Sequence, residues 1–192
     1  LLGSYIYFKV ENEQFQIREA TLAEVNDWYE DIRPTEPQIP IRDLSITEIL
    51  PLDEIEFEMS VAFGAKCSNV STMRTFGFPT GTIPDGFGIP FFYYDEFMQF
   101  NNFYEEAQVM IDNPAFQNDI NFRVERLKDF RRDIKDAPMP QWMMDSLQVM
   151  HDDFPTGTAV RCRSSTNNED LPGFSGAGLY TSKTQHLDEG HI

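Results

Sequence analysis

Residues 160–172 read VRCRSSTNNEDLP, and residues 173–181 continue as GFSGAGLYT. Side chains alternate from Thr158 to Arg163 as in a strand, and the strand delivers an arginine into a loop rich in hydroxyl, amide and glycine groups. Guanidinium offers paired donors to phosphate oxygens, and glycines let backbone N–H groups approach an anion closely. The segment therefore suggests a polyphosphate-binding loop, although a loop of this composition is also an ordinary surface connection.

Two shorter segments upstream also have a distinctive composition. Residues 63–70 read FGAKCSNV, with small residues and one lysine ahead of a helical run that ends at Phe76-Gly77. Residues 83–90 read IPDGFGIP and predict a turn followed by a short strand. A single helix is expected from there to Asn113-Pro114, with a core-facing stripe. The stripe consists of Tyr93, Phe97, Phe100, Tyr104, Ala107 and Ile111.

The first part of the chain has a different organisation. Residues 5–20 alternate around a polar centre and predict a hairpin. The capping box Thr21-Leu22-Ala23-Glu24 predicts a helix that runs to about Ile32. The three prolines of residues 33–40 exclude a helix there and indicate a linker. Residues 45–48 are expected to open a short second helix before Pro51.

Residues 160–172 resemble the VRSSATAEDLP signature of the PEP/pyruvate-binding ATP-grasp domain, which opens phosphoenolpyruvate synthases, pyruvate phosphate dikinases, rifampin phosphotransferases and glucan water dikinases. Residues 63–70 are similar to the GGKGANL element of that domain, and residues 83–90 resemble its VPPGFVV segment. The three elements occur in the family's order. The resemblance implies an α+β fold: residues 59–192 would be a truncated ATP-grasp-like first lobe, a mixed sheet with packed helices. Residues 1–58 would be a small α+β lead-in or part of an appended domain.

The resemblance also implies roles for individual residues. Lys66 matches the lysine that reaches the ATP phosphates, and Arg163 matches the arginine that clamps them, so these two are the catalytic candidates. Gly176 and Gly178 fall in the glycine-rich loop that covers the phosphates. The full ATP-binding set is Lys66, Arg163, Ser164, Glu169, Asp170, Gly176 and Gly178. The residues alone leave other interpretations open, because Lys66 can be a solvated helix-end lysine and Arg163 can form a structural salt bridge with Glu169 or Asp170.

As a member of this family, the chain would bind ATP in a dikinase-type phosphotransferase. The phosphoryl group would pass to a histidine on a separate domain and then to an acceptor such as pyruvate. Most Mg²⁺ ligands would lie outside this chain, as would the phosphohistidine and substrate domains, and the isolated chain would be inactive. Thr181 or Ser182 stands where synthases place a glutamate, which weakens the case for pyruvate. The alternatives are a catalytically silent ATP-grasp-derived interaction or regulatory module, and a plain acidic interaction domain.

The composition of the chain argues against several classes of binding partner. The formal net charge of −17 over 192 residues argues against nucleic acid and anionic membranes, since both need a basic face. No apolar run reaches the length of a membrane span. The two cysteines form neither a disulfide framework nor a zinc motif, are expected to be small packed residues, and favour a cytoplasmic setting. Both ends of the sequence look cut from a longer protein.

Overall fold

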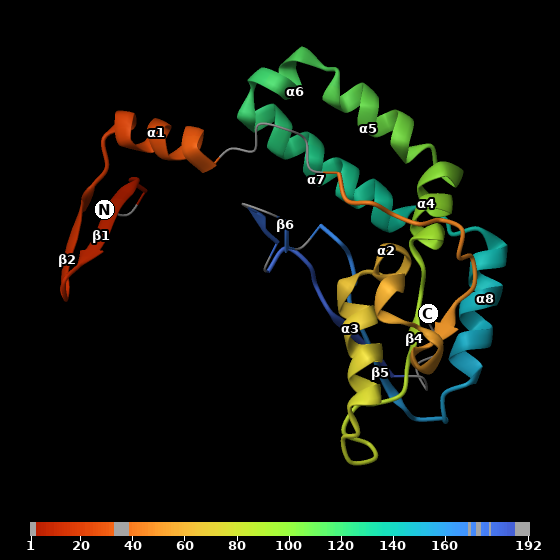
Figure 1. Ribbon diagram of the computed structural model, residues 1–192. Coiled ribbons are helices and arrows are strands. Elements are labelled where there is room, and N and C mark those ends of the chain that lie inside the picture. The colour runs from red at the N-terminus through yellow and green to blue at the C-terminus, as the bar shows by residue number, and fades with distance from the viewer. Residues whose placement is uncertain (1–2, 33–38, 169, 172–173, 177, 187–192) are drawn as a thin grey trace.

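The computed structural model describes residues 3–32, 39–168, 170–171, 174–176 and 178–186. Figure 1 shows a small N-terminal unit of β1, β2 and α1, followed by a larger body that begins near β3. The elements of the N-terminal unit are β1 (Ile6–Glu11), β2 (Gln14–Glu19) and α1 (Leu22–Ile32). Those of the body are β3 (Leu50–Pro51), the 3-10 helices η1 (Leu52–Glu54) and η2 (Phe57–Met59), α2 (Ser60–Phe63), α3 (Ala65–Met73), the 3-10 helix η3 (Arg74–Phe76), β4 (Phe87–Gly88), α4 (Phe91–Phe100), α5 (Phe103–Ile111), α6 (Pro114–Asn118), α7 (Ile120–Asp136), α8 (Gln141–Asp152), β5 (Ala159–Cys162), β6 (Asp170–Leu171), β7 (Phe174–Ser175) and β8 (Lys183–His186).

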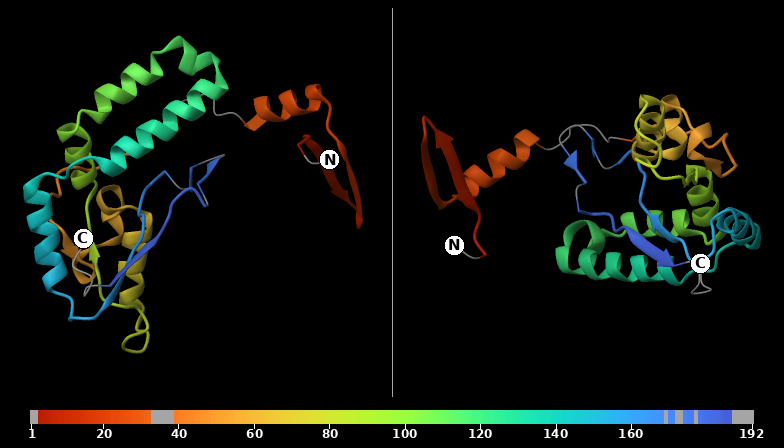
Figure 2. Two further views of the ribbon diagram at one scale, coloured as in Figure 1. Left: turned by 180° about the vertical axis from the view of Figure 1, so that it is seen from behind. Right: turned by 90° about the horizontal axis from the view of Figure 1, so that it is seen from below.

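The N-terminal unit confirms the predicted hairpin and helix. Asn12 and Glu13 join β1 to β2 and both have positive φ, as the tight two-residue turns of hairpins require. The capping box forms as expected: the Thr21 hydroxyl accepts from the Glu24 N–H at 3.3 Å, and the Glu24 carboxylate accepts from the Thr21 N–H at 2.9 Å. Most of the predicted linker, residues 33–38, lies outside the described residues. In both views of Figure 2 the unit stands apart from the body.

The body has a compact core where the 3-10 helices meet α2, α3 and β4. Its buried apolar residues are Leu52, Ile55, Ala62 and Phe63. Gly88 of β4 packs so tightly here that a Cβ on it would fall 2.8 Å from the Cys67 sulfur and 2.9 Å from the Phe63 ring. The sequence therefore places glycine where β4 passes directly over α3.

A helical arm extends from this core (Figure 1). Helices α5 and α7 lie alongside one another, joined by α6, and are linked by the ion pair of Arg126 with Glu106 at 2.6 Å. The rings of Phe103 and Phe130 meet edge to face with centroids 5.7 Å apart. α7 begins with an N-cap at Asp119, whose carboxylate accepts two backbone hydrogen bonds.

Two expectations about helices are wrong. Residues 45–48 form no helix, because the Asp43 carboxylate accepts from the Ser45 N–H at 2.8 Å and the chain then extends into β3. The single helix expected after residue 90 is two helices, α4 and α5, separated at Asn102, where φ is +57°. The break turns part of the expected core stripe outward, so that Phe100 is 57% exposed.

The expected mixed sheet also differs from what is seen. Among the described residues the strands form four separate two-stranded ladders, and each one is antiparallel. Proline limits how far these ladders can extend, since it lacks the N–H that a ladder needs, and Pro51 and Pro90 flank or enter the β3–β4 pair. The mixture of helices and short strands agrees with the expected α+β class.

Candidate functional site

The segment with the arginine-rich strand folds as predicted up to its loop. β5 pairs antiparallel with β8, and Arg161 faces Thr184 across the ladder, donating to its hydroxyl at 2.7 Å. The Arg161 side chain therefore already has a hydrogen-bond partner on the neighbouring strand. Arg163 comes just after the strand ends and is exposed, at the start of the loop of residues 163–168, here called the arginine loop.

The arginine loop docks onto the N-terminus of α3. The N-cap of the helix is Gly64, which has no side chain that could accept a hydrogen bond from the first turn. The Ser165 hydroxyl takes that role and accepts from the Cys67 N–H at 2.9 Å. A residue distant in sequence thus supplies the cap that the helix lacks locally.

Gly64 allows this approach because it has no Cβ. Its φ of +82° is a left-handed value that favours glycine. A Cβ here would fall 2.5 Å from the Ser165 hydroxyl oxygen and closer still to the Ser165 carbonyl group. Backbone conformation and space both require glycine at the contact between the two segments that the sequence singled out.

A second anchor holds the far end of the arginine loop. The Asn167 side-chain amide donates to the Ser60 carbonyl at 3.0 Å and to the Ile41 carbonyl at 3.5 Å. The Thr166 hydroxyl accepts from the Asn168 N–H at 3.1 Å, which tightens the loop between the anchors. The arginine loop is therefore fixed at Ser165 and at Asn167 against the start of α2 and of α3.

Lys66 lies in the first turn of α3, directly before Cys67, and its side chain is exposed. A cation near a helix N-terminus adds to the positive end of the helix dipole instead of offsetting it. Combined with the backbone N–H groups of the first turn, that charge makes the end of α3 attractive to an anion. The hydrogen bond from Cys67 to Ser165 joins the residue that follows Lys66 to the residue that follows Ser164.

The glycine-rich segment forms a turn of its own. The Leu179 N–H donates to the Gly176 carbonyl at 3.0 Å, and Gly178 has a φ of +81° at the position of such a turn that favours glycine. Gly176 is buried and Gly178 is exposed. The backbone of Asp170 pairs with Ser175 in the β6–β7 ladder, while Glu169 lies outside the described residues.

The cysteines near these residues differ from each other. Cys67 is half-buried beside Gly88, and burial raises the pKa of its thiol to about 11, so it stays a neutral packing group. Cys162 is exposed, which corrects the expectation that both are packed.

Within the described ranges no three His, Cys, Asp or Glu side chains gather into a group that could hold a metal ion. No helix in the described part of the chain is long and apolar enough to cross a membrane.

Sequence reasoning selected Ser164 from the serine pair and missed Ser165 and Asn167, the side chains that hold the loop in place. One signal could have found Ser165: residues 63–65 read Phe-Gly-Ala and contain no capping side chain, so the helix needs a cap from elsewhere. The sequence around the helix does not reveal which residue of a loop nearly a hundred residues away will supply the cap. Asn167 carries no such signal, because an asparagine in a polar loop is ordinary.

Comparison with protein families finds one described as pyruvate phosphate dikinase, AMP/ATP-binding domain, which matches residues 60–187, more than half of the chain. Neither the curated proteins nor the solved structures give a match. The matched residues include α3 with Lys66, the arginine loop and the glycine-rich turn. The chain belongs to the family of the AMP/ATP-binding domain of pyruvate phosphate dikinase.

Proposed function

We propose that the N-terminus of α3 and the arginine loop bind the phosphates of ATP, as part of an ATP-grasp-like first lobe spanning residues 59–192. The observation that carries the proposal is the hydrogen bond from the Cys67 N–H to the Ser165 hydroxyl. It joins the helix that bears Lys66 to the loop that bears Arg163, and these are the two cationic side chains that polyphosphate binding calls for.

Each group in this arrangement has a separate task. Lys66 supplies a point charge beside the first turn of α3, and Arg163 supplies a planar pair of donors that can clamp phosphate oxygens. Ser164 lies between Arg163 and the capping Ser165 and offers a hydroxyl to the same oxygens. Glu169, Asp170, Gly176 and Gly178, which follow the arginine loop in the sequence, complete the proposed set. Phosphoryl transfer depends mainly on such positioning and charge stabilisation.

The wider proposal is that the chain serves a dikinase-type phosphotransferase in the cytoplasm. ATP's phosphoryl group would pass to a histidine on a separate domain and on to an acceptor such as pyruvate. Mg²⁺ would shield the phosphate charge when bound. The proposal places most of its ligands outside this chain.

Calorimetric titration with ATP and Mg²⁺ tests the phosphate site. Lys66→Ala and Arg163→Ala should each weaken binding by about 1–3 kcal/mol, the usual contribution of a hydrogen bond to a charged group. Lys128→Ala is the matched control, because this exposed lysine on α7 pairs with Glu125 at 2.6 Å. Binding that ignores both site substitutions would contradict the proposal and favour an interaction or regulatory module.

Turnover is a separate question with a separate measurement. We expect the isolated chain to bind ATP weakly and to consume none, because the proposal places the histidine and the acceptor on other domains. Phosphate release can be followed over hours with and without Mg²⁺. Sustained release that disappears in Lys66→Ala would show that the isolated chain is active and would overturn this part of the proposal.

A further inference from the structure

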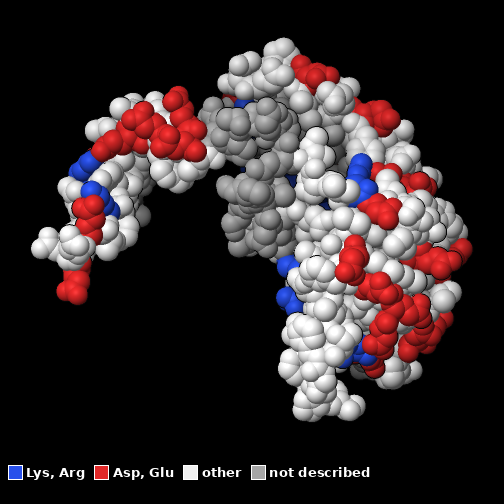
Figure 3. Space-filling model, viewed as in Figure 1, with Lys and Arg blue, Asp and Glu red and all other residues white. Residues whose placement is uncertain are grey.

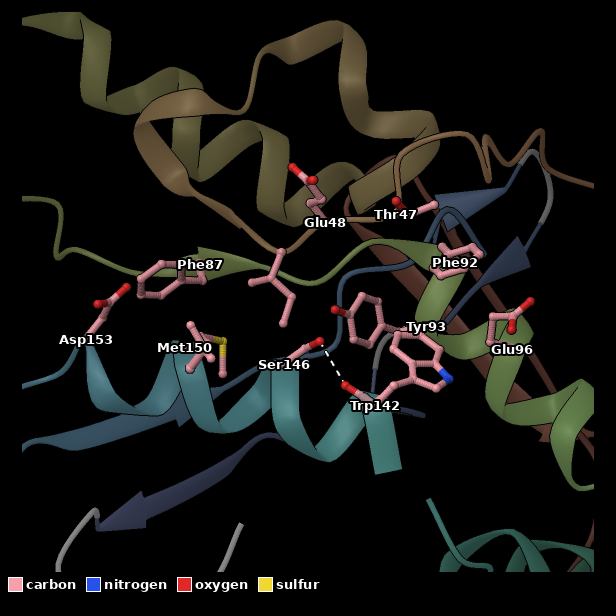
Figure 4. A pocket seen from close by; sticks show the side chains of 12 residues that line it. Thr47, Glu48, Phe87, Phe92, Tyr93, Glu96, Trp142, Ser146, Met150 and Asp153 are labelled. Atoms are coloured by element: carbon pink, nitrogen blue, oxygen red, sulfur yellow. Dashed lines mark hydrogen bonds between the residues drawn. The ribbon is translucent and has the colours of Figure 1, made fainter. Parts of the chain in front are cut away.

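A pocket of about 600 Å³ lies between β4, α4, α8 and the segment that precedes β3. We call it the ring pocket, after Phe92, Tyr93 and Trp142, which gather at one end of it (Figure 4). Its size is that of a small-molecule site. None of the residues proposed above to bind ATP lines it, so the ring pocket is separate from the phosphate site.

The three rings form an inclined cluster. Trp142 has its ring centroid 5.2 Å from that of Tyr93 and 5.8 Å from that of Phe92, with interplanar angles of 58° and 42°. At these angles Trp142 is not stacked face to face with either ring. Phe92 is half-buried and Trp142 is 39% exposed, which leaves ring surface available to a ligand, while the buried Tyr93 supports them. The face of an aromatic ring carries negative charge density and attracts cations.

Carboxylates supply the charge of the ring pocket. Glu48, Glu96 and Asp153 all line it, and its described lining contains no lysine, arginine or histidine. Figure 4 shows Glu96 beside the rings and Asp153 at the opposite end. Within the described part of the chain, none of these three carboxylates takes part in an ion pair or a side-chain hydrogen bond. Figure 3 shows acidic side chains over the same side of the molecule, around α8 and β3.

This combination selects a class of ligand. Phosphates and other anions would meet three uncompensated negative charges, and a neutral apolar ligand would remove water from the carboxylates without replacing their hydrogen bonds or charge. A cation with a small apolar body satisfies both the rings and the carboxylates. Two arginines near the walls of the pocket already have acidic partners. Arg74, which lines a neighbouring pocket with Phe87, is paired with Asp53 and Asp85, and Arg42 is paired with Asp95 of α4, so both leave the charge of the ring pocket negative.

We propose that the ring pocket binds a small organic cation of the quaternary-ammonium class, with Trp142 and Phe92 against the ammonium group and Glu96 as its counter-charge. The cation occupies the aromatic end of the pocket, where a ring surface and a carboxylate lie together. The remaining carboxylates keep anions out. The proposal does not depend on ATP binding and concerns different residues.

Choline and 3,3-dimethylbutan-1-ol test the proposal directly, because they share one shape and differ by a positive nitrogen in place of a carbon. The chain has two tryptophans, so a Trp28→Phe background leaves Trp142 as the only tryptophan reporter. Choline should change its fluorescence saturably, and the alcohol should bind about tenfold more weakly. Equal affinity for the two probes, or no saturable response to choline, would overturn the proposal.

Substitutions then test whether Glu96 is the counter-charge of the bound cation. Glu96→Gln should weaken choline binding about three- to tenfold and leave the affinity for the alcohol unchanged. Glu105→Gln is the matched control, since it removes the same charge from an exposed position on α5 outside the pocket. If the two variants weaken choline binding equally, the effect is the general field of an acidic protein and the assignment of Glu96 fails. Circular dichroism shows that each variant is folded.

Discussion

The hydroxyl oxygen of Ser165 lies 2.9 Å from the backbone nitrogen of Cys67, and 98 residues of sequence separate the two. A loop side chain thereby caps a helix whose own N-cap is glycine. Lys66 precedes Cys67 directly, and Arg163 comes two residues before Ser165. One hydrogen bond thus helps to fix the spacing of the two cationic side chains that we propose to bind phosphate.

Ser165→Ala should remove that cap and leave the Cys67 N–H without its acceptor. The expected loss in the free energy of unfolding is about 1 kcal/mol, the usual effect of deleting a helix cap. Urea unfolding measures it. Ser146→Ala is the control, because among the described residues that hydroxyl donates to a carbonyl of its own helix, at 2.9 Å, and joins no two segments. ATP affinity should also fall in Ser165→Ala but not in Ser146→Ala, and equal effects would contradict a positioning role.

Gly64→Ala should be more damaging than the loss of the serine. The new methyl would meet the backbone of Ser165 and would also strain a backbone with φ of +82°, so we expect a loss of about 2–4 kcal/mol. Gly77→Ala separates the two causes. It shares a left-handed φ of +71° but has open space around the missing Cβ, and should cost only about 1 kcal/mol. Similar thermal unfolding shifts in the two variants would mean that the contact with Ser165 is unimportant.

The sequence predicted those elements whose signals are local. The capping box of Thr21 and Glu24 contains both of its partners within one turn, and Gly77 ends the α3 run with a left-handed φ as expected of a glycine after a helix. The break at Asn102 was missed because an apolar stripe runs through it. There the Asn101 amide donates to carbonyls of Phe97 and Pro138, a tertiary contact that periodicity does not reveal.

In the candidate site too, some residues could be predicted from the sequence and others depend on tertiary contacts. The family signature gave Lys66 and Arg163 by position, while the residues that join their two segments are tertiary. Ser165 acts through a helix distant in sequence, and Asn167 acts through carbonyls of Ser60 and Ile41. Both side chains are common loop residues, so their importance depends on what the folded chain brings next to them. The ring pocket carries no motif at all, since aromatic residues on α4 and α8 read as ordinary core.

The N-terminal unit should respond to acid through Glu24. Hydrogen bonds from Arg18 and then from the Thr21 backbone lower the pKa of this carboxyl from 4.5 to about 2. The folded pKa lies below the ordinary value, so the stabilisation by ionised Glu24 is complete above about 4.5 and is lost as pH falls toward 2. An NMR titration that follows the Thr21 amide should show a midpoint near 2. In Arg18→Gln the midpoint should rise, and an unchanged midpoint would exclude Arg18 as the main cause.

Arg74 should be intolerant even of lysine. Its guanidinium, only 17% exposed, binds Asp53 through two nitrogens at 2.5 and 3.0 Å, Asp85 at 2.7 Å, and the carbonyls of Ile83 and Pro84. One side chain therefore holds η1 and the turn before β4 against the end of α3.

Lysine keeps the charge but lacks the planar fork that reaches all four partners. Asp53 and Asp85 are themselves largely exposed, so solvent discounts the ion pairs, and we expect Arg74→Lys to cost about 1–2 kcal/mol in urea unfolding. Arg132→Lys on α7 is the control, because its pairs with Asp129 and Asp133 are exposed at the surface and should change stability by less than about 0.5 kcal/mol. Equal losses would mean that Arg74 acts as a charge alone; a larger loss at Arg74 would mean that its fork geometry holds the turn in place for β4 to pass over α3.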